Sequence, residues 1–162
     1  MTTAYTSNAG QTQALAAAIA EVCIPGDLLV LVGDLGAGKT AFTQGFGRAL
    51  GVTAAITSPT FTLANEYDGD DVLIHHLDVY RIEQLDEVRD LALSELLDGD
   101  AITLIEWGDA ILPALPNDYL EVRLTYGEGD DDRVVEIRAS GARWVPRTSV
   151  LQAATQKWGS TC

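Results

Sequence analysis

The chain is poor in lysine and rich in acidic residues. Lys39 and Lys157 are its only lysines, and 10 basic residues stand against 24 acidic ones, which gives a net charge of −14. A surface this acidic repels phosphate backbones unless its basic residues cluster, so we expect no direct binding to nucleic acid. A protein partner is compatible with this charge, and so is a solubility role that involves no partner.

Cysteines and long apolar segments are also scarce. Cys23 and Cys162 lie far apart and indicate neither a disulfide framework nor a metal cluster, so a reduced cytoplasmic setting is the simplest expectation. No apolar run approaches the ~20 residues of a membrane-spanning helix, and we expect no membrane partner. Residues 1–10 are polar and contain no Lys or Arg, which is unlike a secretion signal.

A glycine-rich motif is the most informative stretch. Residues 33–40, Gly-Asp-Leu-Gly-Ala-Gly-Lys-Thr, match the pattern G-x-x-x-x-G-K-[ST] of phosphate-binding loops, the P-loop. The apolar residues 28–32 before it predict a buried strand, and residues 40–50 after it are compatible with a helix. Gly36 and Gly38 allow backbone conformations in which successive N–H groups turn toward phosphate oxygens. The order strand, loop, helix is the one that nucleotide binding requires.

Each part of this motif has an expected role. Lys39 would reach the β- and γ-phosphates of a nucleotide, the Thr40 hydroxyl would bind Mg²⁺, and the helix N-terminus would add N–H donors. The alternative is a glycine-rich turn with an incidental lysine. The predicted cofactor-binding residues of the loop are Gly33, Leu35, Gly36, Ala37, Gly38, Lys39, Thr40 and Ala41.

Two carboxylates follow apolar strands and could complete a metal site. Asp78 follows residues 72–77 and Glu106 follows residues 102–105, at the strand ends where ligands bind in open α/β sheets. Mg²⁺ takes only one or two carboxylates, so either or both could hold it, although each could instead be a cap or an ion-pair partner. We predict Lys39, Asp78 and Glu106 as catalytic residues and Thr40, Glu106 and Asp78 as metal ligands. Which group orients the attacking water stays open.

Other polar residues near these positions are weaker candidates. Residues 57–60, Thr-Ser-Pro-Thr, form a hydroxyl-rich segment of the kind that contacts the γ-phosphate in switch loops, or else a capped turn. This makes Thr57, Ser58 and Thr60 candidate nucleotide contacts. Arg81 could be an arginine finger, but a surface ion pair is preferred. His75 and His76 alternate in a strand, so one faces inward, and a structural role is favoured over a metal site.

The element pattern predicts an α/β fold. Apolar and polar spacing indicates βα units early in the chain and hairpins later; the expected strands cover residues 3–6, 28–32, 61–67, 72–78, 101–105, 119–126 and 133–139, and the expected helices residues 8–22, 40–50, 83–97 and 150–157. We predict a P-loop NTPase-like three-layer domain with a mixed, mostly parallel central sheet and antiparallel hairpin additions. Residues 1–145 would form the P-loop ATPase domain, and residues 146–162 a C-terminal extension of the same domain.

Adenine is the expected base, because neither lysine lies in the N/T-K-x-D signature that reads guanine. A small-molecule kinase is one alternative function, although the arginines are scattered rather than gathered in a lid. A nucleotide-dependent interaction module without significant turnover is another. The sequence cannot separate slow switches from ATPases, because both use the same parts.

The combined motifs resemble the TsaE family, the small bacterial ATPases of tRNA threonylcarbamoyladenosine biosynthesis. The resemblance spans about residues 5–126, and its most specific part is the pair formed by residues 33–40 and Thr-Ser-Pro-Thr-Phe at 57–61. The weaker matches are Thr12-x-x-Leu15, His76-x-Asp78-x-Tyr80-Arg81 and Ile105-Glu106-Trp107.

This resemblance implies a function. It implies ATP and Mg²⁺ binding, weak hydrolysis by the isolated chain, and work alongside TsaB and TsaD to modify adenosine 37 of tRNAs that read ANN codons. It implies Mg²⁺ ligation by Thr40 and Glu106, an activity role for Asp78, a switch at residues 57–60, and a place near the nucleotide for Thr12. The tRNA would be reached only through the complex, in agreement with the acidic charge.

Overall fold

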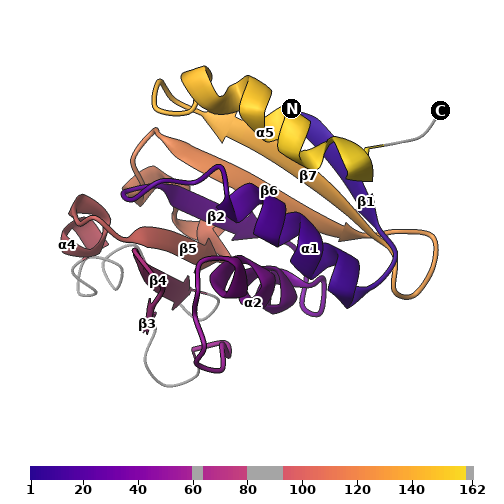
Figure 1. Cartoon of the computed structure of the whole chain (residues 1–162), viewed down its shortest axis with the longest axis horizontal. Helices are drawn as coiled ribbons and strands as arrows, with labels where there is room; N and C mark the ends of the chain where they lie inside the picture. Colours follow the sequence, from indigo (N-terminus) through magenta and orange to yellow (C-terminus); the bar gives the residue numbers. More distant parts are fainter. Residues whose placement is uncertain (60–63, 80–92, 160–162) are drawn as a thin grey trace.

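A computed structural model gives the fold of the 162-residue chain and describes residues 1–59, 64–79 and 93–159 (Figure 1). Strands are labelled β, α-helices α and 3₁₀ helices η. In chain order the elements are β1 (Thr2–Thr6), α1 (Ala9–Ala20), β2 (Leu28–Val32), α2 (Lys39–Ala49), β3 (Ala64–Asp68), β4 (Leu73–Asp78), α4 (Leu93–Asp98), β5 (Ile102–Glu106), η1 (Gly108–Ala114), β6 (Tyr119–Tyr126), β7 (Arg133–Ser140), η2 (Val145–Arg147), α5 (Thr148–Thr155) and η3 (Gln156–Trp158).

The strands form one mixed sheet. Its 7 strands lie in the order β1-β7-β6-β2-β5-β4-β3. The four central strands β6, β2, β5 and β4 run parallel to one another. Antiparallel pairings add β7 and β1 beside β6, and β3 beside β4. This confirms the predicted α/β class with a parallel centre and hairpin additions. The carboxyl ends of β2, β4 and β5 meet at one edge, where ligands bind in such sheets.

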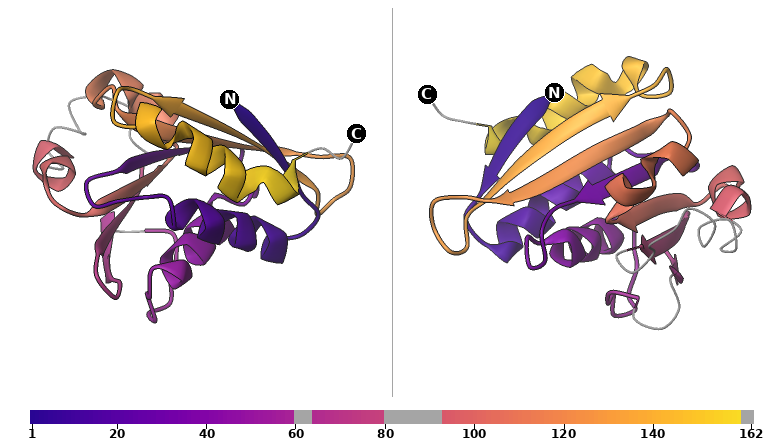
Figure 2. Two further views of the ribbon diagram at one scale, coloured as in Figure 1. Left: turned by 45° about the horizontal axis from the view of Figure 1, so that its top comes forward. Right: turned by 180° about the vertical axis from the view of Figure 1, so that it is seen from behind.

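Helices cover both faces of this sheet. The helices α1, α2 and α5 lie on one face (Figure 1), over a core that includes Leu29, Leu31 and Phe42. The opposite face, seen from behind in the right panel of Figure 2, carries α4 and η1 over a second core that includes Val30 and Ile111. Successive residues of β2 point to opposite faces, so an all-apolar strand buries side chains in both cores. The three predicted layers are present.

The predicted helices and hairpins agree with the structure where it describes them. Asn8 caps α1 through its side chain, which accepts a hydrogen bond from the Gln11 N–H at 2.9 Å. The β3–β4 and β6–β7 hairpins are both formed. Of the predicted helix 83–97, residues 93–97 lie in α4, which ends one residue later at Asp98, whereas residues 80–92 lie outside the described part of the chain.

The described part of the C-terminal segment packs on the same core as α1. Leu151 and Trp158 are buried there, as is Trp144 just before η2. The division of the chain at residues 145 and 146 stays a prediction. Among the helices in residues 1–59, 64–79 and 93–159, none combines the length and the apolar character that crossing a membrane takes.

Candidate active site

The P-loop turns at its glycines, as the motif predicts. Gly36 and Gly38 have φ values of 79° and 107°, in a region that strains any residue with a Cβ. Gly38 is the N-cap of α2, and the helix begins at Lys39. The loop therefore leaves β2 and bends over the N-terminus of α2, where unpaired helix N–H groups can bind an anion.

Lys39 folds back onto the loop. Its ammonium donates hydrogen bonds to the carbonyl oxygens of Gly33 at 2.7 Å and Asp34 at 2.9 Å. It also lies 3.9 Å from the centre of the Trp107 ring, a cation–π contact. Trp107 adopts a left-handed backbone conformation, with φ of 62°, directly after β5. Neutral carbonyls thus hold the ammonium, and a phosphate oxygen is a stronger, charged acceptor that can replace them.

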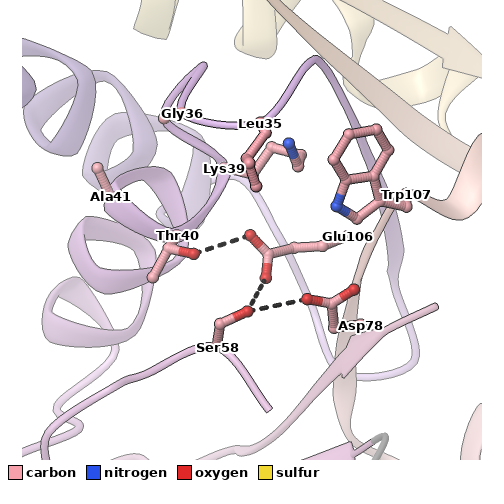
Figure 3. A pocket seen from close by; sticks show the side chains of 10 residues that line it. Leu35, Gly36, Lys39, Thr40, Ala41, Ser58, Asp78, Glu106 and Trp107 are labelled. Atoms are coloured by element: carbon pink, nitrogen blue, oxygen red, sulfur yellow. Dashed lines mark hydrogen bonds between the residues drawn. The ribbon is translucent and has the colours of Figure 1, made fainter. Parts of the chain in front are cut away.

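The two predicted carboxylates meet beside this lysine. Asp78 and Glu106 are paired in the register of β4 and β5, so both leave the same edge of the sheet. The Thr40 hydroxyl donates to Glu106 Oε1 at 3.0 Å, and the Ser58 hydroxyl reaches Asp78 Oδ2 at 2.9 Å and Glu106 Oε2 at 3.3 Å (Figure 3). All three predicted metal ligands are therefore brought together by the fold.

Burial and neighbouring charges shift the pKa values of Lys39 and Glu106 in opposite directions. Burial lowers the pKa of Lys39, while the nearby carboxylates of Glu106 and Asp78 raise it by a smaller amount. Burial raises the pKa of Glu106, but hydrogen bonds and charge from His76, Thr40 and Lys39 outweigh it, so the pKa of Glu106 is lowered. The carboxylate is therefore ionised at neutral pH, the state in which it can hold a cation.

These oxygen donors fit a hard divalent cation. A hydroxyl and two carboxylates are groups that Mg²⁺ binds, and it usually keeps water or phosphate oxygens for its other positions. Among the described residues, no three His, Cys, Asp or Glu side chains gather as a metal site of their own. The pocket has a volume of about 200 Å³, and its walls are formed by Leu35, Gly36, Gly38, Lys39, Thr40, Ala41, Ser58, Asp78, Glu106 and Trp107.

The remaining predicted contacts do not line this pocket where the structure describes them. Thr12 is buried and its hydroxyl pairs with that of Thr6 at 2.8 Å, while a Cβ on Gly38 would lie 3.9 Å from its methyl group. Thr12 therefore packs behind the P-loop. The backbone of Thr57 faces β3, where its carbonyl accepts from the Asn65 amide at 3.4 Å. Gly33 and Ala37 belong to the loop but do not form the pocket wall. Thr60 and Arg81 lie outside the described residues.

Two residues that hold the loop were missed by the sequence analysis. The Tyr126 hydroxyl donates to the Leu35 carbonyl at 2.7 Å. Arg133 donates to the carbonyls of Ala37 at 3.1 Å and Gly36 at 3.3 Å, and it stacks on the Tyr126 ring. The β6–β7 hairpin therefore pairs with carbonyls on the outside of the loop. No pattern in the sequence marks either residue, because the pairing depends on where the hairpin lies in the sheet.

A third missed contact lies beneath Glu106. The sequence predicts that one of two neighbouring histidines faces inward; in the structure His76 is fully buried and His75 is buried as well, at 8% exposed. Its Nε2 atom lies 2.9 Å from Glu106 Oε2. Strand alternation could have indicated the orientation of His76, but not its partner.

Comparison with known proteins places these features in a family. The model of the family described as "Threonylcarbamoyl adenosine biosynthesis protein TsaE" matches residues 6–135. The chain belongs to the TsaE family. A TsaE protein of Bacillus subtilis is 43% identical over 139 residues, which is 86% of each chain. One from Streptomyces coelicolor is 40% identical over 132 residues, which is 78% of this chain and 88% of the relative.

A solved structure supports the same assignment. The crystal structure of YdiB from Bacillus subtilis superposes with a TM-score of 0.78, at 36% sequence identity and over 93% of both chains. The resemblance to TsaE that the motifs indicated is thus confirmed. Since these relatives match most of the chain, the fold and the P-loop pocket both lie within the TsaE-like region.

Proposed function

We propose that this TsaE-family chain is the ATP-binding and hydrolysing subunit of tRNA threonylcarbamoylation. The B. subtilis and S. coelicolor relatives are named as tRNA threonylcarbamoyladenosine biosynthesis proteins. The observation that carries the proposal is the pocket in which Lys39 and Thr40 of the P-loop face Glu106 and Asp78. A phosphate cradle beside an ionised carboxylate is the arrangement that nucleotide hydrolysis requires.

The binding step uses the P-loop. Backbone N–H groups of residues 36–40 and the Lys39 ammonium hold the nucleotide phosphates, with ATP favoured over GTP because a guanine signature is missing. Thr40 and Glu106, with Asp78 beside them, would hold Mg²⁺. When bound, that ion neutralises charge on the β- and γ-phosphate oxygens. Burial of the ammonium and of Glu106 strengthens these interactions by excluding water.

Asp78 and Glu106 have different roles in this proposal. Glu106 is 2% exposed and accepts hydrogen bonds from Thr40 and His76, which suits a fixed metal ligand. Asp78, which also forms part of the pocket wall, is half-buried and accepts a hydrogen bond from the Ser58 hydroxyl. We assign the orientation of the attacking water to Asp78, because it is the carboxylate more open to solvent.

The proposal includes partners. The isolated chain would hydrolyse ATP weakly and would be activated by TsaD and TsaB in the cytoplasm, where the assembly modifies adenosine 37 of tRNAs that read ANN codons. With a net charge of −14, the chain would contact tRNA only indirectly, through those partners. A subunit that contributes nucleotide hydrolysis needs no basic surface of its own.

The deciding experiment measures ATP hydrolysis by the purified chain, alone and with TsaB and TsaD. The variant Lys39→Ala is the control, because it removes the ammonium that would donate hydrogen bonds to the phosphates and leaves both carboxylates in place. We expect a partner-dependent rise that the variant lacks, and a nucleotide affinity lowered by about 100-fold or more in that variant.

Three other outcomes would each contradict a different part of this proposal. If turnover does not rise although ATP still binds in a Mg²⁺-dependent way, the P-loop assignment stands and the pathway is wrong. Stoichiometric phosphate transfer to a small-molecule acceptor would instead indicate a kinase. Normal nucleotide affinity in Lys39→Ala would contradict the role given to the lysine.

A further inference from the structure

Two adjacent histidines of β4, both buried, contact different glutamates. The His75 imidazole lies near the edge of the sheet and contacts Glu66 at 3.1 Å, whose side chain is 64% exposed. The His76 side chain is 0% exposed and points the other way, since successive strand residues alternate between faces. It contacts Glu106, a wall residue of the P-loop pocket, at 2.9 Å. The active site thus has a buried imidazole behind its carboxylate.

The two oxygens of Glu106 have separate partners. Oε1 accepts from the Thr40 hydroxyl at 3.0 Å, on the side of the predicted metal (Figure 3). Oε2 lies 2.9 Å from His76 Nε2 and 3.3 Å from the Ser58 hydroxyl. The imidazole is therefore the nearer partner of Oε2, and it comes from a central strand rather than a loop. It restricts rotation of the Glu106 carboxylate, so that one oxygen faces Thr40 and the other faces the imidazole.

The other nitrogen of His76 indicates the direction of this hydrogen bond. Nδ1 is buried and has no hydrogen-bond partner among the described residues. A proton on Nδ1 would be a buried unpaired donor, whereas a proton on Nε2 is donated to an ionised carboxylate. An imidazole that carries its proton on Nε2 satisfies both conditions. Its role is thus to donate one fixed hydrogen bond to Glu106.

We propose that His76 is a positioning residue that holds Glu106 in the orientation needed to bind a divalent cation together with Thr40. This rests on the proposed function, because the cation belongs to the nucleotide site. A partner behind a metal ligand restricts its rotation, and removing such a partner typically lowers metal affinity by about 10–100-fold. His76 acts through Glu106 and touches neither the nucleotide nor the metal.

The experiment measures binding of a fluorescent ATP analogue to the full chain, once with excess Mg²⁺ and once with EDTA. The ratio of the two affinities is the gain from Mg²⁺. In His76→Leu we expect this gain to fall by about tenfold or more, with unchanged affinity in EDTA, because the P-loop itself is intact. His76→Gln should recover most of the gain, since its amide nitrogen can reach the position of Nε2.

His75→Leu is the matched control. It removes the adjacent imidazole of the same strand, which contacts an exposed glutamate instead of the pocket. We expect the gain from Mg²⁺ in this variant to equal that of the wild-type chain.

Two results would overturn the inference. One is a wild-type gain in His76→Leu, and the other is an equal loss of affinity with Mg²⁺ and with EDTA, which would mark a merely structural role. If the leucine variant does not fold, His76→Asn replaces it. Its amide is too short to reach Glu106, so equal gains in the asparagine and glutamine variants would contradict the proposal. A wild-type chain with no gain from Mg²⁺ would remove the proposed function and this inference with it.

Discussion

Two buried carboxylates of this protein, Asp27 and Glu106, are used in opposite ways. Asp27 lies before β2 and accepts from both Arg147 nitrogens at 2.6 and 2.8 Å, from Arg143 at 2.8 Å and from the Ile24 N–H at 2.8 Å. Two cations therefore surround one anion. Hydrogen bonds and charge from these partners lower the pKa of Asp27 although burial acts to raise it.

Glu106 shares the burial and the lowered pKa but not the charge balance. Its hydrogen-bond partners are the Thr40 and Ser58 hydroxyls and the His76 imidazole. A second carboxylate, that of Asp78, lies next to it in the sheet register. Among the residues that the structure describes here, Glu106 and Asp78 face the ammonium of Lys39, so negative charge exceeds positive charge, as a cation site requires.

Position in the sheet separates the two roles of these carboxylates. Asp27 stands at the amino end of β2, where its ion pairs join the C-terminal segment to the sheet. Glu106 stands at the carboxyl end of β5, where strand ends and helix N-termini gather ligands. A lowered pKa alone would not distinguish the carboxylate that stabilises the fold from the one that serves the site.

The largest effect is expected from Asp27→Ala. The substitution leaves two arginines without their buried partner, so the free energy of unfolding should fall by about 3–5 kcal/mol. Urea unfolding of the purified chain measures it. Nucleotide affinity of the folded variant should match wild type. A loss below about 1 kcal/mol would show that the ion pairs of Asp27 with Arg143 and Arg147, the Asp27 cluster, do not stabilise the fold.

Glu106→Gln should lower ATP turnover and leave the stability of the fold nearly unchanged. It keeps the shape of the side chain and removes the charge that would hold Mg²⁺, so partner-stimulated ATP turnover should fall by about 100-fold or more, equivalent to ~3 kcal/mol. Stability should change by less than about 1 kcal/mol, since the hydroxyl and imidazole partners remain available. Steady-state kinetics and urea unfolding of the same preparation test both parts. Turnover close to wild type would remove Glu106 from the site.

The two arginines of the Asp27 cluster should differ from each other. Arg147 makes two short contacts with Asp27 and its side chain is 15% exposed, whereas Arg143 makes one contact with Asp27 and its side chain is 38% exposed. We expect Arg147→Ala to lower the free energy of unfolding by about 2 kcal/mol and Arg143→Ala by about 1 kcal/mol, because solvent screens the more exposed pair. Thermal unfolding of the two variants measures which loss of stability is larger. The reverse order would contradict the geometry.

The smallest effect is an acid dependence. The pKa of Asp27 in the folded chain lies below its ordinary value of 3.8, so its contribution is complete above that pH and is lost as the pH falls through the folded value. The stability difference between wild type and Asp27→Asn should stay constant from about pH 7 to 5 and shrink in stronger acid. Urea unfolding across this range measures it. A stability difference that grows toward low pH would contradict the lowered pKa of Asp27.

Local patterns in the sequence determined the strand, P-loop and helix around residues 33–40. Glycine positions, the apolar strand and the helix start act over a few residues, so the motif specifies its own backbone. The two carboxylates could also be placed, because Asp78 and Glu106 each end an apolar run and parallel strands end at a common edge. The hairpins followed from their turn residues. These predictions needed no knowledge of strand order.

Only the tertiary structure decided the contacts between distant segments. Arg133 is 96 residues from the Ala37 carbonyl that it binds, Arg147 is 120 residues from Asp27, and His76 is 30 residues from Glu106. Each contact requires a particular strand order, such as β7 beside β6 or β4 beside β5. A side chain's spacing along the sequence does not encode that order, because hydrophobic patterning specifies which face of a strand is buried and not which strand lies next to it.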